Sequence, residues 1–584
     1  MSVKTKTARW SYSKHQWLGL IGGISLLVWG LSGLTHIAMV LFGPQQAQFM
    51  PPAAAVALEG ARPIAQTLAE HGIGQAVAVK TVPAPGGVVL WQVTASADGA
   101  RRYFRPADGS EVTAGDRAQA EFLARHYLAT DRPMTAARLQ NEFDADYPWV
   151  NRLLPVWKLE FAGDDGLIAY VHTETSSLAA VNNTTKTRLQ SVFRALHTWE
   201  WVPPGMDWLR VIVIALMVGS LLALGLTGIA MLVTVRRRKR LPGARGWHRI
   251  AGYVLALPLI MFSASGIYHL IQSALVPPVS QLKMGRPVNV ASGKWPVEKD
   301  WALIAKGRDI ASVALVEGAG GQPLYRIGLA PKGPMGGGEH DHGPVKAAAD
   351  HGMAGHDHAA MMAAAQGKTP TTDAEIREAR FAGIKPDGPA IYLDAATGAV
   401  EPSGDRELAR AIARRFTGAP DNAVTGVELV TRFCPDYDFR NKRLPVWRVD
   451  YGTPVNASLF VDTGAGVLVD RVADGEKPER LVFSFIHKWN FLFPVGRLAQ
   501  NVIVGVFAIA LIGLMAVLGL RMDLIRRLRA SRHGQRLERT GMTCGRIGAR
   551  KVASWATTDT PTQSIGSTVS LRPSHLPDSE ISPP

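Results

Sequence analysis

The chain has 584 residues, of which 64 are Lys or Arg and 48 are Asp or Glu, which gives a formal net charge of +16. A basic balance of this kind is typical of nucleic-acid-binding proteins, so the placement of the positive charge decides what it means. The two cysteines, Cys434 and Cys544, exclude a disulfide framework, a cysteine-rich zinc site and an iron–sulfur cluster. Length alone indicates roughly four structural units.

Four segments are long enough and apolar enough to cross a bilayer, which takes about 20 residues of helix. We expect these membrane spans at 15–42, 207–235, 250–276 and 501–522. The remaining segments are then a short N-terminus, a large domain, a basic loop, a second large domain and a disordered tail. In that order they occupy 1–14, 43–206, 236–249, 277–500 and 523–584.

The positive charge is concentrated next to the ends of these spans. The N-terminal segment carries +4, the loop between the second and third spans +7, and residues 521–584 carry +6. These three segments together carry +17, so the rest of the chain carries −1. Lys and Arg accumulate on the cytoplasmic side of membrane proteins. We therefore predict that both termini are cytoplasmic, that the two large domains are periplasmic, and that nucleic acid is not a partner.

The chain also contains an internal repeat. The sequence at 143–157 recurs at 433–447 with an offset of 290 residues, and the first and third spans match with an offset of 233 residues. Each half then reads as span, outer domain, span, and the second half carries 57 extra residues in its outer domain. This organisation predicts a membrane α-helical bundle of four spans in two pseudo-symmetric halves, with two extracytoplasmic domains.

Each outer domain alternates β-like runs bounded by turn residues with helical stretches, which is typical of small α+β units. We expect strands near 90–94 and 390–393, and helices near 118–130 and 406–416.

Six of the 16 histidines lie at or inside span ends, and all six form repeat pairs: His15 with His248, His36 with His269, and His197 with His487. Ionisable side chains at membrane depth are costly, so they are functional candidates. His15 and His36 are 21 residues apart in one span. This spacing corresponds to about 31 Å of helix, so the two histidines should lie near opposite membrane surfaces.

Neutral imidazole binds haem iron, and a helical bundle can hold a haem between facing histidines. Symmetry predicts one inner haem between His15 and His248. The four other histidines would suffice for one haem with spare ligands or for two haems, and both arrangements stay open. The alternative is that these histidines reach the lipid headgroups and that the nearby glycines aid helix packing.

The order of these motifs resembles the PepSY-associated transmembrane family over residues 10–525. The motifs are His15-x-Trp17-x-Gly19, the histidine–aromatic motifs at His197 and His487, and the hairpin Tyr392-x-Asp394-x-x-Thr397-Gly398. The resemblance implies a bacterial inner-membrane protein with periplasmic PepSY-like domains and two or more b-type haems held by the span histidines. It also implies an oxidoreductase similar to haem-containing ferric-siderophore reductases, which passes electrons from an unidentified donor to a ferric chelate.

Residues 335–362, in the second outer domain, are rich in His and Met and account for much of its extra length. Imidazole suits copper, zinc, nickel and iron, whereas thioether sulfur favours copper(I). The candidate metal ligands are His340, His342, His351, Met353, His356, His358, Met361 and Met362. A second hypothesis is therefore a non-enzymatic protein that handles periplasmic copper or iron; the alternative is a solvated low-complexity loop.

Overall fold

The computed structural model describes residues 3–203, 205–235, 243–275, 288–289, 304–330, 381, 383–384 and 388–544. The chain divides into two compact units, Met1–Asp523 and Leu524–Pro584. The expected basic loop lies partly outside the described residues, and the expected His- and Met-rich segment at 335–362 lies wholly outside them.

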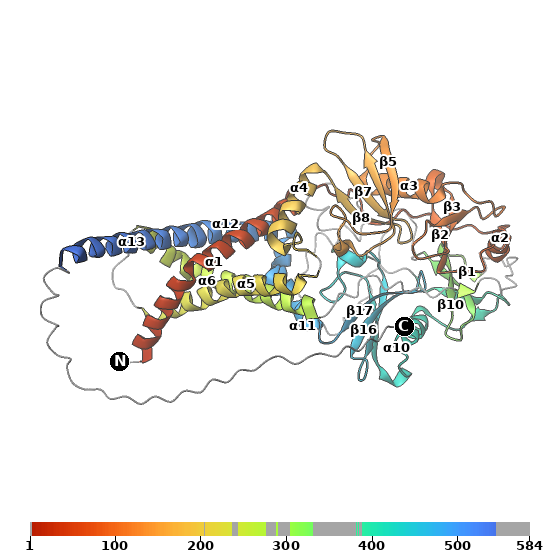
Figure 1. Ribbon diagram of the computed structural model, residues 1–584. Helices are drawn as coiled ribbons and strands as arrows, with labels where there is room; N and C mark the ends of the chain where they lie inside the picture. Colours follow the sequence, from red (N-terminus) through yellow and green to blue (C-terminus); the bar gives the residue numbers. More distant parts are fainter. Residues whose placement is uncertain are drawn as a thin grey trace, which may run out of the picture. The chain divides into compact units, whose positions relative to one another are not determined.

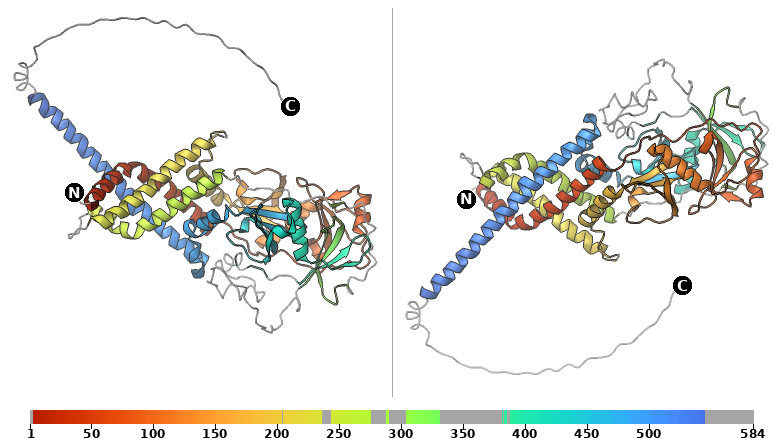
Figure 2. Two further views of the ribbon diagram at one scale, coloured as in Figure 1. Left: turned by 90° about the horizontal axis from the view of Figure 1, so that it is seen from below. Right: turned by 90° about the horizontal axis from the view of Figure 1, so that it is seen from above.

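Among the described residues, four helices are long enough and apolar enough to cross a membrane. The first three are α1 (Val3–Phe42), α5 (Asp207–Thr234) and α6 (Gly243–Leu275). The fourth runs from α12 (Arg497–Ala510) through the π-helical turn η8 (Leu511–Val517) into α13 (Leu518–Cys544). Helix α1 packs against α5 and η8, and α6 packs against the same two elements, so the four helices form one bundle (Figures 1 and 2).

The outward side chains of this bundle are apolar, whereas its interior contains small polar residues. Leu216, Leu257 and Ile509 are each at least 60% exposed, as expected for side chains that contact lipid. Ser25 and Ser263 are buried, and each hydroxyl donates to the carbonyl one turn earlier, at 2.8 and 2.7 Å. Small residues with satisfied hydroxyls allow membrane helices to approach closely.

The helices extend beyond the expected spans. α1 begins at Val3 and α6 at Gly243, so the helices include the basic residues of the N-terminal segment and also Arg245 and Arg249. The expected disordered tail at 523–584 is wrong for its first part, because α13 continues to Cys544. Residues 524–539 are rich in Leu and Arg and contain no proline, a composition that favours helix. The tail beyond residue 544 lies outside the described residues.

The soluble part contains two four-stranded antiparallel sheets with the same strand order. The first consists of β5 (Met134–Gln140), β6 (Val156–Phe161), β7 (Ile168–His172) and β8 (Ser177–Asn182). The second consists of β14 (Val424–Val430), β15 (Val446–Tyr451), β16 (Ala457–Asp462) and β17 (Val467–Ala473). Register matches too, because Leu139 pairs with Trp157 and Leu429 with Trp447. Helix α3 (Gly115–Leu128) packs on the first sheet, and α10 (Asp405–Thr417) on the second.

A seven-stranded sheet joins the two large segments that the sequence presents as separate domains. Its order is β13-β12-β11-β10-β2-β3-β4. The first large segment supplies β2 (Ala78–Pro83), β3 (Val89–Thr94) and β4 (Arg102–Phe104), and the second supplies β10 (Ile310–Glu317), β11 (Pro323–Leu329), β12 (Ile391–Asp394) and β13 (Val400–Glu401). The junction is antiparallel, with Val79 opposite Leu315. The short strands β1 (Gln75–Ala76) and β9 (Val288–Asn289) also pair across the segments. The expected strands and helices in these regions are confirmed as β3, β12, α3 and α10.

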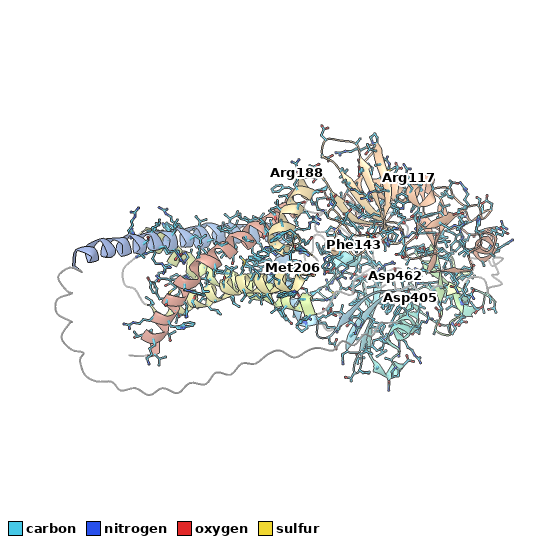
Figure 3. The ribbon with its side chains drawn as sticks, in the orientation of Figure 1. Arg117, Phe143, Arg188, Met206, Asp405 and Asp462 are labelled. Atoms are coloured by element: carbon cyan, nitrogen blue, oxygen red, sulfur yellow. The ribbon has the colours of Figure 1, made fainter. Side chains whose placement is uncertain are left out.

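A buried ion cluster also joins the two segments. Glu174 of the first segment pairs with Arg443 of the second, and Lys80 Nζ lies 3.7 Å from Glu174 Oε1. Arg443 Nη1 also lies 2.8 Å from Asp462 Oδ2; Asp462, labelled in Figure 3, is the last residue of β16. Burial by itself would raise the pKa of Glu174, but Arg443 and Lys80 outweigh burial and hold that pKa well below its usual range.

Candidate functional site

The bundle brings His15 of α1 and His248 of α6 together. Their ring centroids are 6.3 Å apart, and the ring planes meet at 65°. A glycine lies beside each ring: a Cβ atom at Gly228 would be 3.6 Å from Cε1 of His15, and one at Gly519 would be 3.6 Å from Cε1 of His248. Each imidazole therefore lies next to a glycine, which has no side chain to fill the space beside the ring.

Hydrogen bonds fix the protonated nitrogen of both rings. His15 Nδ1 lies 3.1 Å from Thr227 Oγ1, and that hydroxyl lies 2.7 Å from the Ala223 carbonyl, to which it donates. The Thr227 oxygen thus accepts from Nδ1–H of His15. His248 Nδ1 lies 3.1 Å from the Leu514 carbonyl, which can only accept. In both rings Nδ1 carries the proton, and the lone pair is on Nε2.

A π-helical turn explains why the two partners differ. Arg210 of α5 and Gln500 of the fourth span donate to equivalent carbonyls, and these two residues are 290 positions apart in the chain. Further along the same helices, the equivalent residues Gly228 and Gly519 are 291 positions apart. The extra residue falls in η8, as expected for a π-bulge. Leu518 then occupies the place of Thr227, and His248 bonds directly to the backbone.

Two further histidines are held at the ends of short helices that pack on the spans. His197 lies in the π-helical turn η3 (Arg194–Thr198), which follows α4 (Thr184–Phe193), and His487 lies in η6 (Phe483–His487), which follows α11 (Lys477–Val482). Ser32 Oγ of α1 is 2.9 Å from His197 Nδ1, and Ser265 Oγ of α6 is 3.0 Å from His487 Nδ1.

These serine hydroxyls also donate to carbonyls of their own helices. Ser32 Oγ lies 3.1 Å from the Trp29 carbonyl, and Ser265 Oγ lies 2.6 Å from the Met261 carbonyl. Each oxygen therefore accepts from the histidine Nδ1–H, as Thr227 does. Nε2 of both histidines keeps its lone pair.

His36 and His269 complete a four-histidine cluster with His197 and His487. Phe193 lies 5.4 Å from His36 and 4.6 Å from His197, and Phe483 lies 4.1 Å from His269 and 4.9 Å from His487, measured between ring centroids. His197 interacts electrostatically with His36 and His269, and His487 interacts electrostatically with the three other histidines of the cluster.

The six predicted histidines thus fall into two groups, the His15–His248 pair and the four-histidine cluster. The sequence did not indicate the roles of several neighbours: Ser32, Phe193, Thr227, Ser265, Glu479 and Phe483. The internal repeat could have revealed Phe193 and Phe483, which match at an offset of 290 residues. Thr227 and Glu479 could not be found this way, because Val517 and Leu189 stand at the corresponding positions. The eight metal-ligand candidates from His340 to Met362 lie outside the described residues.

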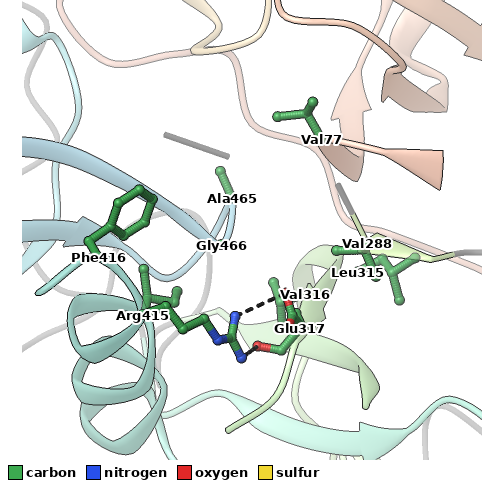
Figure 4. Close-up of a pocket in the computed structure, with 10 residues that line it drawn as sticks. Val77, Val288, Leu315, Val316, Glu317, Arg415, Phe416, Ala465 and Gly466 are labelled. Atoms are coloured by element: carbon green, nitrogen blue, oxygen red, sulfur yellow. Dashed lines mark hydrogen bonds and ion pairs between the residues drawn. The ribbon is translucent and has the colours of Figure 1, made fainter. Parts of the chain in front are cut away.

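Other parts of the described chain offer less chemistry. Within the described ranges, the histidine groups included, no three side chains of His, Cys, Asp or Glu are grouped so that they could hold a metal ion. A pocket in the soluble part is lined by Val77, Leu315 and Phe416, among others (Figure 4). Its charged groups, Arg415 and Glu317, pair at 3.1 Å. Arg415 and Glu317 are thus already paired with each other, so the histidines of the membrane helices are the better candidate site.

The fold and the site define a membrane protein in which four bilayer-length helices carry β-sheet domains and hold paired histidines. Residues 12–527 match the family model of the PepSY-associated TM region, and the chain belongs to that family. The family resemblance drawn from the sequence motifs is therefore confirmed. No curated protein matches the chain.

Proposed function

We propose that this protein is a haem b electron-transfer protein that carries electrons across the bacterial inner membrane and reduces a ferric chelate, such as a ferric siderophore, on the periplasmic side. The observation that carries this proposal is the His15–His248 pair, in which two imidazoles from different spans lie close together with Nε2 available on each.

The donor set of this pair fits a haem: His15 and His248, whose ring centroids lie 6.3 Å apart, would hold the iron through imidazole nitrogen. The hydrogen bonds on Nδ1 provide the orienting contacts that ligating histidines ordinarily have, and Gly228 and Gly519 leave room beside the rings.

The four-histidine cluster would hold one or two further haems. When bound, haem supplies reversible one-electron transfer. The chain's own contribution is to orient the imidazoles and to exclude water. A buried apolar core that includes Leu26, Leu255 and Leu259 lies between the two histidine levels of the spans. Trp29 stacks on Trp199 with centroids 5.9 Å apart, next to the cluster.

The proposal includes two pseudo-symmetric halves and a defined orientation. Equivalent residues hold His197 and His487 through Ser32 and Ser265, and the two four-stranded sheets have one strand order. Both features support a pseudo-two-fold axis along the membrane normal. The +17 carried by three segments supports cytoplasmic termini and periplasmic β-sheet domains.

An absorbance spectrum tests the proposed cofactor. The full-length protein, purified in detergent, should show b-type bands that sharpen on reduction with dithionite. Reduced protein should be reoxidised by an added ferric chelate, with one ferrous ion formed per electron. A protein without dithionite-reducible b-type bands would exclude the proposal.

The His- and Met-rich composition of residues 335–362 supports a second candidate function, the non-enzymatic handling of copper or iron. Deleting this segment separates the two functions. If haem content and chelate reduction survive and only metal binding falls, the segment is an accessory to electron transfer. If the wild type lacks haem and the deletion abolishes metal tolerance, metal handling is the main function.

A further inference from the structure

The two halves differ at the residue that corresponds to Glu479, which lies beside His269 in the second half. His269 Nδ1 is 2.6 Å from Oε1 of Glu479, a residue of α11 that is 8% exposed. At the corresponding position in the first half, 290 residues earlier, the chain has Leu189. A carboxyl group therefore contacts His269 in the second half, whereas the corresponding residue of the first half has an alkyl side chain.

This contact fixes both the tautomer and the direction of the His269 ring. A carboxylate oxygen at 2.6 Å accepts the Nδ1 proton, so in the neutral ring the lone pair lies on Nε2. Phe483 stacks on the ring with centroids 4.1 Å apart and an interplanar angle of 21°, which restricts its rotation. The neighbouring Arg480 is engaged elsewhere, since its Nη1 donates to the Asp436 carbonyl at 2.9 Å.

A carboxyl partner on the far nitrogen makes an imidazole a stronger donor to a metal. A stronger axial donor stabilises the ferric state over the ferrous state and so lowers the reduction potential of a haem. Resting on the proposed haem function, we propose that Glu479 is a positioning residue for His269. It lowers the reduction potential of the haem that takes His269 as a ligand, and it makes the two halves of the four-histidine cluster electronically different.

Potentiometric titration of the purified full-length protein, followed in the b-type absorbance bands, tests this inference. Glu479→Leu reproduces the arrangement of the first half and should move one midpoint potential to a more positive value. Glu479→Gln, which keeps the size and one acceptor oxygen, should move it in the same direction by less. The reciprocal Leu189→Glu change should move a midpoint potential to a more negative value.

Glu476→Gln is the matched control, because it removes the same charge one turn away, where the carboxyl accepts from the Ala473 amide at 2.7 Å. It should leave all midpoints unchanged. Unaltered midpoints in Glu479→Gln at full haem content would overturn the inference, and so would an equal shift in Glu476→Gln. If the Glu479→Leu protein cannot be purified, the midpoint potentials of Glu479→Gln still test the inference. A wild-type protein without haem would instead overturn the proposed function.

Discussion

The imidazole rings of His15 and His248 lie 6.3 Å apart, although 233 residues separate them in the chain. Each ring is fixed from a different span of the bundle, His15 through Thr227 of α5 and His248 through Leu514 of η8. The site therefore draws on all four membrane helices, and neither half of the chain can form it alone.

Removing one member of this pair should remove one haem. We expect His248→Ala to lose one haem per protein while the four-histidine cluster keeps its complement, because the two groups use different residues. The measurement is the ratio of haem to protein in detergent. His126→Ala is the control, since His126 lies in the soluble part, with Nε2 2.9 Å from the Met50 carbonyl. A His248→Ala protein with an unchanged ratio would contradict the assignment.

Thr227 should matter through its hydrogen bond to His15. Thr227→Val keeps the shape of the side chain but removes the acceptor for Nδ1–H, and losing such an orienting contact lowers metal affinity by about 10–100-fold. We expect faster loss of one haem to an apo-haem acceptor protein. The control is Thr234→Val, because Thr234 Oγ1 makes the same contact with a carbonyl one turn back, at 2.6 Å. Equal rates in the two variants would show that the effect is general to the helix.

The membrane spans and the six histidines could be predicted from sequence because they leave local signals. A span needs a continuous apolar run, and the repeat offsets of 233 and 290 residues pair His36 with His269 and His197 with His487. The seven-stranded sheet could not be predicted, since the pairing of β2 with β10 joins residues more than 200 positions apart. Partners that occur in one half only, such as Glu479, could not be predicted for a different reason: the repeat has no matching residue to mark them.

The orientation of the chain can be tested with fusions. An alkaline phosphatase domain, which is active only outside the cytoplasm, should be active when joined after Gly99 in the turn between β3 and β4. It should be inactive when joined after Arg240, in the loop that carries +7. A green fluorescent protein fused at the same two places should give the opposite pattern. Phosphatase activity at Arg240 would reverse the predicted topology.

The buried Glu174 should stabilise the junction of the two β-sheet segments. Glu174→Gln leaves Arg443 and Lys80 buried with less negative charge, and breaking a buried ion pair in this way costs about 3–5 kcal/mol. We expect a clearly lower melting temperature in detergent at pH 7. Glu428→Gln is the control, because its carboxylate lies 3.6 Å from Arg448 with a side chain that is 64% exposed, and an exposed pair contributes about 0–1 kcal/mol.

The lowered pKa of Glu174 also determines how the stability of the folded protein should depend on pH. The folded-state pKa of Glu174 is held below its unfolded value of about 4.3. Its stabilisation is therefore complete above that pH and is lost as the pH falls toward the folded-state pKa. The difference in melting temperature between wild type and Glu174→Gln should be constant from pH 8 to about 5 and should shrink below about pH 4. A difference that persists unchanged at pH 3 would show that the carboxylate is not the source of the stability.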